Sequence, residues 1–412
     1  MEENFKKNTI WNTIGITLNS FNSLFFLIII NRVNGVDVAG VFSFAFSAAC
    51  LLYAVGIYSG RTYQVSDIKR ELNDREYLVH KFYTCIIMML LAFVFIAIRN
   101  YDFEKNIIII LLCFYKCLEA FSDTLYGYLQ KNNKLYIVGK SLFFKSLIGI
   151  IVFLLVDLIT KNIIISCIAL LLNSLLFVAF YDAYKSKKYI SQESINLKNV
   201  NKLFKLGFSV FAFSFLAVFI VNIPKYVIDY LLTDAYQTIF SIIVMPGTVV
   251  SLCGQYIMAP MLTNIVDCLD RKAYKEFNSI VNKMVKILLI FALLIEIAAV
   301  LLGIPILSFV YAIDLTDYKI DLILIIFGAI MYAVAGIYST ALITMRKNNM
   351  QLLIYSIDSI FGLIICYFLI YNFGIHGATY GYLFTMILHV ILYIIYYIYE
   401  YKKLKDLRLN NN

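Results

Sequence analysis

The chain has 412 residues, of which 62% are hydrophobic and only 15% are charged. A soluble domain of this length could not hide so much apolar surface, so the composition excludes a soluble globular protein. The net charge of +9 requires no nucleic-acid partner, because anionic lipid headgroups at the inner leaflet can balance it. Composition therefore indicates an integral membrane protein in contact with lipid.

Twelve apolar stretches follow one another along the chain, separated by short polar loops. Crossing a hydrocarbon core of about 30 Å takes about 20 mostly apolar residues. The stretches are continuously apolar, which fits helices and does not fit the alternating strands of a barrel. We predict an all-α integral membrane protein with spans at 9–30, 38–60, 82–98, 107–129, 136–156, 163–184, 206–222, 238–260, 284–303, 321–345, 350–371 and 378–399.

The loop charges predict an orientation. If the N-terminus lies inside, the inner segments hold 27 of the 35 Lys and Arg residues, and the outer segments hold 6. This asymmetry is what the positive-inside rule requires. It predicts an even number of spans and cytoplasmic N- and C-termini.

A faint repeat divides the chain. Gln130–Leu135 reads Gln-Lys-Asn-Asn-Lys-Leu, and Arg346–Leu352 reads Arg-Lys-Asn-Asn-Met-Gln-Leu. Each lies between the fourth and fifth spans of a six-span unit, so the two halves form a parallel repeat, as in transporters whose bundles rock about a central site. The predicted parts are an N-terminal six-helix bundle at 1–184, a cytoplasmic linker at 185–205, a C-terminal bundle at 206–399 and a tail at 400–412.

The fourth span carries three ionisable residues, Lys116, Glu119 and Asp123. At about 100° per residue they fall within a stripe about 60° wide. Lys116 and Glu119 are close enough to pair, and Lys145 of the fifth span lies at a comparable depth. Ionisable groups in a bilayer are costly and mark functional sites. Two interpretations remain open: a polar wall of a water-filled substrate cavity, or a self-neutralising cluster that joins adjacent helices.

Other polar residues extend this candidate substrate cavity. Asn19 and Asn22 lie close to one face of the first span, and Arg61 closes the second span. Arg32 and Lys225 cap the outer ends of the first and seventh spans, where cations at a cavity mouth would suit a diphosphate. Snorkelling to the interface explains such end-of-span cations equally well.

A carboxylate in the eleventh span is a candidate for binding a coupling ion. Asp358 lies about two turns from the cytoplasmic end, between Ser356 and Ser359. Asp358, Glu119 and Asp123 are candidate residues for binding a coupling H⁺ or Na⁺. A purely structural role for Asp358, as a buried and hydrogen-bonded carboxyl, fits the sequence equally well. The sequence shows no catalytic group and no metal-type His or Cys spacing, and His376 and His389 are interpreted as interface or packing residues.

Two loop segments carry a family resemblance. Asn31-Arg32-Val33-Asn34-Gly35-Val36-Asp37-Val38-Ala39-Gly40-Val41-Phe42-Ser43 and Phe373-Gly374-Ile375-His376-Gly377-Ala378 resemble the polysaccharide-transport branch of the MATE-like flippase (MOP) superfamily, the Wzx-type O-antigen and capsule repeat-unit flippases. The resemblance implies a MATE-like fold in the bacterial cytoplasmic membrane. It implies movement of undecaprenyl-diphosphate-linked oligosaccharide from the inner to the outer leaflet by alternating access, for O-antigen (lipopolysaccharide), capsule or exopolysaccharide synthesis. A polysaccharide polymerase and a chain-length regulator would be its partners, and no cofactor is expected.

Two other functions compete with that of a flippase. A MATE-type drug antiporter would carry a hydrophobic cation, and Lys116 and Lys145 argue against a cavity for one. A membrane-embedded polysaccharide polymerase would need a sizeable outer loop, whereas the longest, 223–237 and 304–320, are short. No nucleotide-binding motif is present. We therefore expect a transporter rather than an enzyme.

Overall fold

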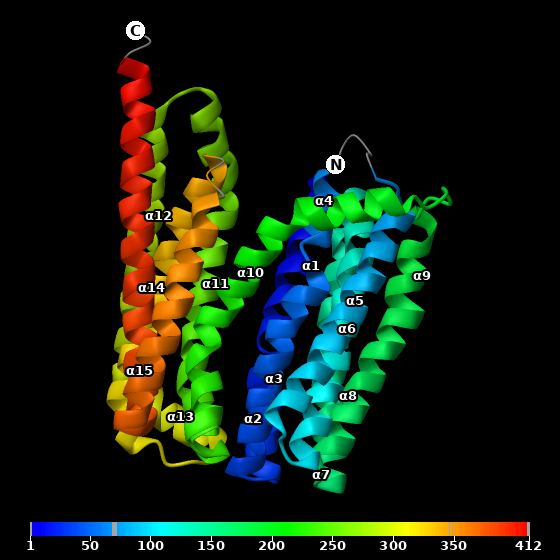
Figure 1. Cartoon of the computed structure of the whole chain (residues 1–412), viewed down its shortest axis with the longest axis vertical. Coiled ribbons are helices and arrows are strands. Elements are labelled where there is room, and N and C mark those ends of the chain that lie inside the picture. Colours follow the sequence, from blue (N-terminus) through cyan, green and yellow to red (C-terminus); the bar gives the residue numbers. More distant parts are fainter. Residues whose placement is uncertain (1, 68–71, 346, 348, 410–412) are drawn as a thin grey trace. The chain divides into compact units, whose positions relative to one another are not determined.

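The computed structural model describes residues 2–67, 72–345, 347 and 349–409, and these residues form helices and connecting turns with no strand (Figure 1). Ten segments of this described chain are long and apolar enough to cross a membrane. One of them, Met350–Leu404, consists of two helices joined at Gly374, where φ is 58°. Helix α6, Phe103–Lys131, also has spanning length but carries the charged stripe. The described residues therefore contain twelve segments of spanning length, as predicted. The all-α membrane fold is confirmed.

The chain divides into two compact units, residues 1–218 (unit 1) and 219–412 (unit 2). Helix α10, Leu197–Leu231, runs through that boundary without a break. The division into two compact units does not test the internal repeat. The predicted bundles at 1–184 and 206–399 and the linker at 185–205 therefore stay a prediction. The second copy of the repeated sequence is 346–352, and its residues 346 and 348 lie outside the described residues.

Unit 1 contains six predicted spans, some of them broken into two helices. The strongest pairings are of α1 with α7, α3 with α6, α7 with α8, and α5 with α6. A π-helical turn, Val178–Asp182, interrupts the sixth span. The helices are α1 (Glu2–Ser20), α2 (Asn22–Val33), α3 (Val36–Ile57), α4 (Gly60–Ser66), α5 (Asp74–Arg99), α6 (Phe103–Lys131), α7 (Leu135–Thr160), α8 (Ile163–Phe177) and α9 (Ala183–Ser186).

The start of α5 is set by local chemistry. The Asn73 side chain accepts a hydrogen bond from the Glu76 backbone, and the Glu76 carboxylate accepts one from the Asn73 backbone. This capping box satisfies two amides that the first helical turn leaves unpaired. The helix consequently begins eight residues before the apolar stretch 82–98 that predicted it. It carries His80 and Lys81 into the interior of unit 1.

Helices α1 and α7 touch through glycines. A Cβ added at Gly139 would collide with the backbone of Trp11 and Asn12, and one added at Gly15 would collide with Gly139. Small residues at such a crossing let helix backbones approach closely, which is a common means of packing in membranes. The glycines therefore fix the distance between the first and fifth spans.

Unit 2 is built around the hairpin within α15 (Asn349–Leu409). Its two halves fold back on each other at Gly374 and lie side by side (Figure 1). A Cβ at Gly381 would meet Cys366, and one at Gly362 would meet Thr385, so glycines also allow this close approach. The remaining elements are the last part of α10, α11 (Asp234–Asp270), α12 (Tyr274–Ala298), a π-helical turn (Ala299–Gly303), α13 (Ile304–Tyr311) and α14 (Lys319–Thr344).

We expect Gly139→Ala to destabilise the protein by about 1–3 kcal/mol, because the added methyl group forces two helix backbones apart. The matched control is Gly336→Ala, since nothing lies within 4 Å of a Cβ at that helical position. Thermal unfolding of both purified variants in detergent, followed by size-exclusion chromatography, measures the difference. Equal melting temperatures for the two variants would contradict this packing.

Candidate functional site

The charged stripe of α6 begins with an internal ion pair. Lys116 Nζ lies 2.7 Å from Glu119 Oε2, which confirms the predicted pairing, and each side chain is 11% exposed. The ammonium also lies over the rings of Phe46, Tyr53 and Tyr115, at 4.7, 5.5 and 5.4 Å from their centroids. Aromatic faces attract cations, most strongly where water is scarce. Lys116 thus occupies an aromatic box next to its carboxylate partner.

Asp123, the third member of the stripe, pairs with a different helix. Arg61 of α4 places Nη1 3.0 Å from Asp123 Oδ1. Its Nε and Nη2 both donate to Gln130 Oε1, at 3.0 and 2.7 Å. The Arg61 and Asp123 side chains remain 26% and 17% exposed. The sequence analysis placed Arg61 and Asp123 in one cavity but did not predict that they pair.

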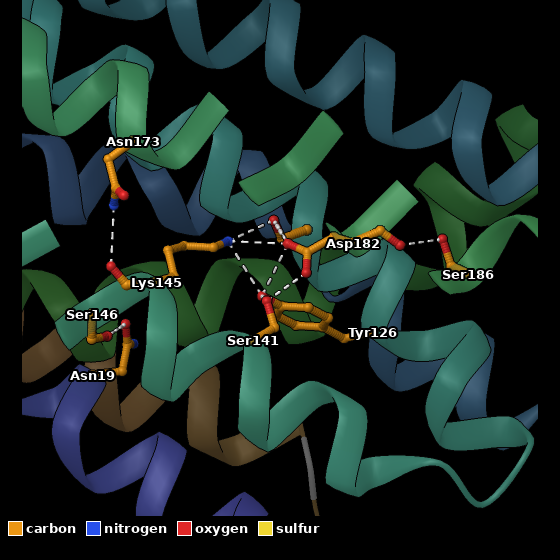
Figure 2. Close-up of polar contacts among 9 residues, drawn as sticks. Asn19, Tyr126, Ser141, Lys145, Ser146, Asn173, Asp182 and Ser186 are labelled. Atoms are coloured by element: carbon orange, nitrogen blue, oxygen red, sulfur yellow. Dashed lines mark hydrogen bonds and ion pairs between the residues drawn. The ribbon is translucent and has the colours of Figure 1, made fainter. Parts of the chain in front are cut away.

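Lys145 is held in the interior by an aspartate that the sequence analysis missed. Figure 2 shows its ammonium facing Asp182, with Nζ 3.1 Å from Asp182 Oδ2. Lys145 also contacts the Ser122 and Tyr126 hydroxyls at 3.0 and 3.3 Å. Asp182 accepts further hydrogen bonds from Ser122, Tyr126 and Ser141. The two side chains are only 5% and 1% exposed, so both charges are compensated inside unit 1.

The asparagines of the first span adjoin this cluster. The span breaks at Phe21, between α1 and α2, and Asn19 and Asn22 lie on either side of the break. Asn22 donates to Ser146 at 3.1 Å and to Asn19 at 3.3 Å, and Ser146 donates to Asn19 at 3.2 Å. Both asparagines thus contact Ser146, which follows Lys145 on α7, and Figure 2 shows Asn19 beside Ser146.

These contacts form four polar clusters, each with a residue on α6 or α7, and we call the four together the polar band of unit 1. It joins side chains of six helical segments and passes through a membrane-spanning bundle. Of the seven residues predicted for a substrate cavity, all belong to it. Its members are Asn19, Asn22, Arg61, Lys116, Glu119, Ser122, Asp123, Tyr126, Gln130, Ser141, Lys145, Ser146 and Asp182.

A buried lysine that the sequence analysis missed caps α3. Lys81 is fully buried and donates to the carbonyls of Gly56 and Ile57, at 2.6 and 2.9 Å. A cation at a helix C-terminus satisfies carbonyls that the helix leaves unpaired. The helix ends there because Tyr58 and Ser59 adopt left-handed φ angles of 40° and 57°. The Asn-x-x-Glu pattern before α5 could have revealed that Lys81 lies within a helix rather than in a loop.

In unit 2, Asp358 has a histidine partner. His389 Nδ1 lies 2.6 Å from Asp358 Oδ2, and the side chains are 1% and 0% exposed. The rings of Tyr332, Tyr355 and Tyr393 surround the imidazole at 5.4, 5.0 and 4.9 Å. The other oxygen of Asp358, Oδ1, has no hydrogen-bond partner among the described residues. His389 is therefore a partner of the candidate coupling residue as well as a packing residue.

The two cations predicted at the outer mouth belong to different units. Arg32 is exposed in the last turn of α2, in unit 1. Lys225 is half-buried in α10, directly after Pro224, in unit 2. Their predicted role at a shared cavity mouth stays a prediction.

Comparison with known proteins supports the resemblance found in the sequence. No protein-family model matches the chain. A capsular polysaccharide biosynthesis protein of Staphylococcus aureus, CapF, is 23% identical over 383 residues, which is 90% of this chain and 94% of that protein. The inward closed conformation of the lipid II flippase MurJ aligns with a TM-score of 0.72 at 16% identity, over 96% of this chain and 90% of that one.

A multidrug resistance MATE family transporter of the MOP superfamily, in its inward-facing conformation, aligns with a TM-score of 0.71 at 10% identity. That alignment covers 96% of this chain and 99% of the transporter. The predicted resemblance is thus confirmed: the chain has the fold of the MOP superfamily transporters and is similar to a polysaccharide biosynthesis protein over most of its length.

We expect Asp182→Asn to lower the free energy of unfolding by about 3–5 kcal/mol, because it leaves the Lys145 charge buried without a partner. Adding Lys145→Met should restore part of that loss, since the double variant contains no buried charge at this point. Melting temperature and membrane abundance of the wild type, the single variant and the double variant measure the effect. A double variant as unstable as Asp182→Asn would show that this ion pair does not hold the bundle together.

Proposed function

We propose that this chain, with its MOP superfamily fold and its similarity to a capsular polysaccharide biosynthesis protein, is a flippase for a lipid-linked glycan. Its substrate would be an undecaprenyl-diphosphate-linked oligosaccharide repeat unit, moved from the inner to the outer leaflet of a bacterial cytoplasmic membrane by alternating access. The lipid tail would remain in the bilayer, and the headgroup would pass along the polar band of unit 1. A polysaccharide polymerase would use the product outside, with a chain-length regulator as a further partner.

The Arg61–Asp123 contact is the observation that carries this proposal. A guanidinium within a membrane protein needs an anionic partner, and Asp123 supplies one at 3.0 Å. Because the Arg61 side chain is still 26% exposed, an incoming diphosphate can reach it and replace the carboxylate. Guanidinium binds phosphate oxygens with two parallel hydrogen bonds, which a single carboxylate oxygen in this contact does not match.

The rest of the polar band suits a sugar headgroup. The side-chain amides of Asn19 and Asn22 and the neighbouring hydroxyl of Ser146 offer both donors and acceptors, as sugar hydroxyls require. Without substrate, Asn22 and Ser146 both donate to the Asn19 side-chain oxygen, whereas the buried Asn22 Oδ1 has no partner among the described residues and is free to accept from a sugar hydroxyl. Arg32 and Lys225 would receive the diphosphate at the outer mouth. Glu119, Asp123 and Asp358 would bind the coupling H⁺ or Na⁺.

Export of an organic cation is the second candidate function. The aromatic box of Phe46, Tyr53 and Tyr115 already holds an ammonium group, that of Lys116. A hydrophobic cation could take that place if Lys116 moved away, and Glu119 would then be its counter-ion. The positive charges of Arg61 and Lys145 in the same band oppose such a substrate.

The first test is export of surface polysaccharide by cells that depend on this protein. We expect Arg61→Ala to reduce export at least about tenfold, because it removes charge-assisted hydrogen bonds to the diphosphate. Arg61→Lys should also be impaired, since an ammonium cannot form the paired contact. The matched control is Arg271→Ala, which removes an exposed arginine paired with Asp267 at 2.8 Å. Membrane abundance is measured for each variant.

The same variants in proteoliposomes separate the two candidate functions. Wild-type protein should make a fluorescent undecaprenyl-diphosphate oligosaccharide accessible to an external enzyme, and Arg61→Ala should not. Normal export by an abundant Arg61→Ala variant would contradict the proposed role of Arg61. Efflux of a lipophilic cation, together with failure to flip the glycolipid, would favour the second candidate.

A further inference from the structure

Unit 2 contains a second carboxylate–histidine pair, at the end that the loop charges predict to be outside. His376 Nδ1 lies 2.7 Å from Asp321 Oδ2. Asp321 is 3% exposed in the first turn of α14, whereas the His376 side chain is 46% exposed just after the break at Gly374. The pair thus joins a buried carboxylate to an imidazole that solvent can reach.

The two pairs share a helix. His376 and His389 both belong to the second half of α15, thirteen positions apart, which corresponds to about 20 Å along the helix axis. The outer pair is open to solvent through His376, and the inner pair, Asp358–His389, is buried on both sides. One pair can exchange protons with solvent, and the other can hold a proton away from it.

Hydroxyl groups lie between the two pairs. Thr379 is fully buried, and its hydroxyl has no hydrogen-bond partner among the described residues. Tyr382 follows on the buried side of the same helix and packs on Gly328 of α14, where an added Cβ would lie 2.8 Å from its ring. One turn further along α14, Tyr332 stacks on the imidazole of His389. Thr379 and Tyr382 therefore lie between His376 and His389 along the second half of α15, and both are buried.

We propose that Asp321–His376 is the site at which protons enter unit 2, and that Asp358–His389 is the site at which they are held. Thr379, Tyr382 and Tyr332 line the route between them. The inference rests on the proposed transport function and names its coupling ion as the proton. Uptake of one proton changes the inner pair from a neutral imidazole beside a carboxylate to a pair with no net charge. The buried negative charge is lost, and burial of the pair becomes more favourable.

The groups around each pair favour H⁺ over Na⁺. The His389 imidazole of the inner pair is surrounded by the rings of Tyr332 from α14, which stacks on it, Tyr355 from the first half of α15, which is tilted, and Tyr393 from the second half, which meets it edge to face. Hard cations require several oxygen ligands, and His389 already occupies one oxygen of Asp358. Around the outer pair, Tyr318 lies 5.9 Å from the His376 ring, with Asp317 and Tyr236 of α11 near Tyr318.

The three histidines of the chain, His80, His376 and His389, make the inference testable without a transport assay. Protein labelled with ¹⁵N-histidine in nanodiscs gives ring signals that single His→Gln variants assign. We expect His376→Gln and Thr379→Val each to slow solvent exchange of the His389 ring proton about tenfold, because only local opening would then expose it. The matched control is Tyr371→Phe, at an exposed tyrosine of the same end. Unchanged exchange in both test variants would overturn the inference.

A second measurement links the pair to transport. In proteoliposomes, a pH gradient should accelerate flipping by the wild type and should no longer accelerate flipping by Asp358→Asn, while exchange of glycolipid without a gradient continues. Asp321→Asn gives the same test at the outer pair if Asp358→Asn does not fold. A Na⁺ gradient that drives flipping at constant pH would overturn the assignment of the proton. Absence of glycolipid flipping by the wild type, with the slowed exchange present, would reject the proposed function and leave the proton route standing.

Discussion

A charge inside a membrane bundle is costly without a partner, and three polar pairs join helical segments within the two units. Lys145–Asp182 joins α7 to the turn after α8, Arg61–Asp123 joins α4 to α6, and Asp358–His389 joins the two halves of α15. Separating α7 from that turn would leave the buried Lys145 and Asp182 without charge compensation, and separating the two halves of α15 would leave the buried Asp358 without its hydrogen-bond partner. Ion pairs therefore supply the specificity that the hydrophobic effect cannot provide between helices surrounded by lipid.

Helix α6 shows how one element can carry polar contacts that differ in exposure. It carries too many charges to qualify as an apolar span, yet it contacts α3, α4, α5, α7 and α8. Its deeper face is fixed by the buried Lys145–Asp182 pair through Ser122 and Tyr126, whereas Asp123 meets an arginine that remains partly exposed. The same helix thus makes a buried contact on one side and a partly exposed contact on the other.

The sequence predicted the twelve spans and the Lys116–Glu119 pair because both depend on short-range patterns, namely hydrophobic length and helical spacing. The partners of Asp123, Lys145 and Asp358 could not be predicted, since they lie 62, 37 and 31 positions away. No local pattern encodes which face of one helix meets another. Asp182 lies near the end of the predicted span 163–184 and was missed because no local pattern predicts the π-helical turn in which it is buried.

The glycine contact between α1 and α7 has a mechanical consequence. With no side chain between the two backbones, neither helix can slide past the other without steric collision. Helices α1 and α7 therefore move together as one rigid unit. Bending within the first span is left to the break at Phe21, where α1 ends and α2 begins. Asn19 and Asn22 flank that joint, so any flexing there would directly alter the spacing of the amides along the polar band.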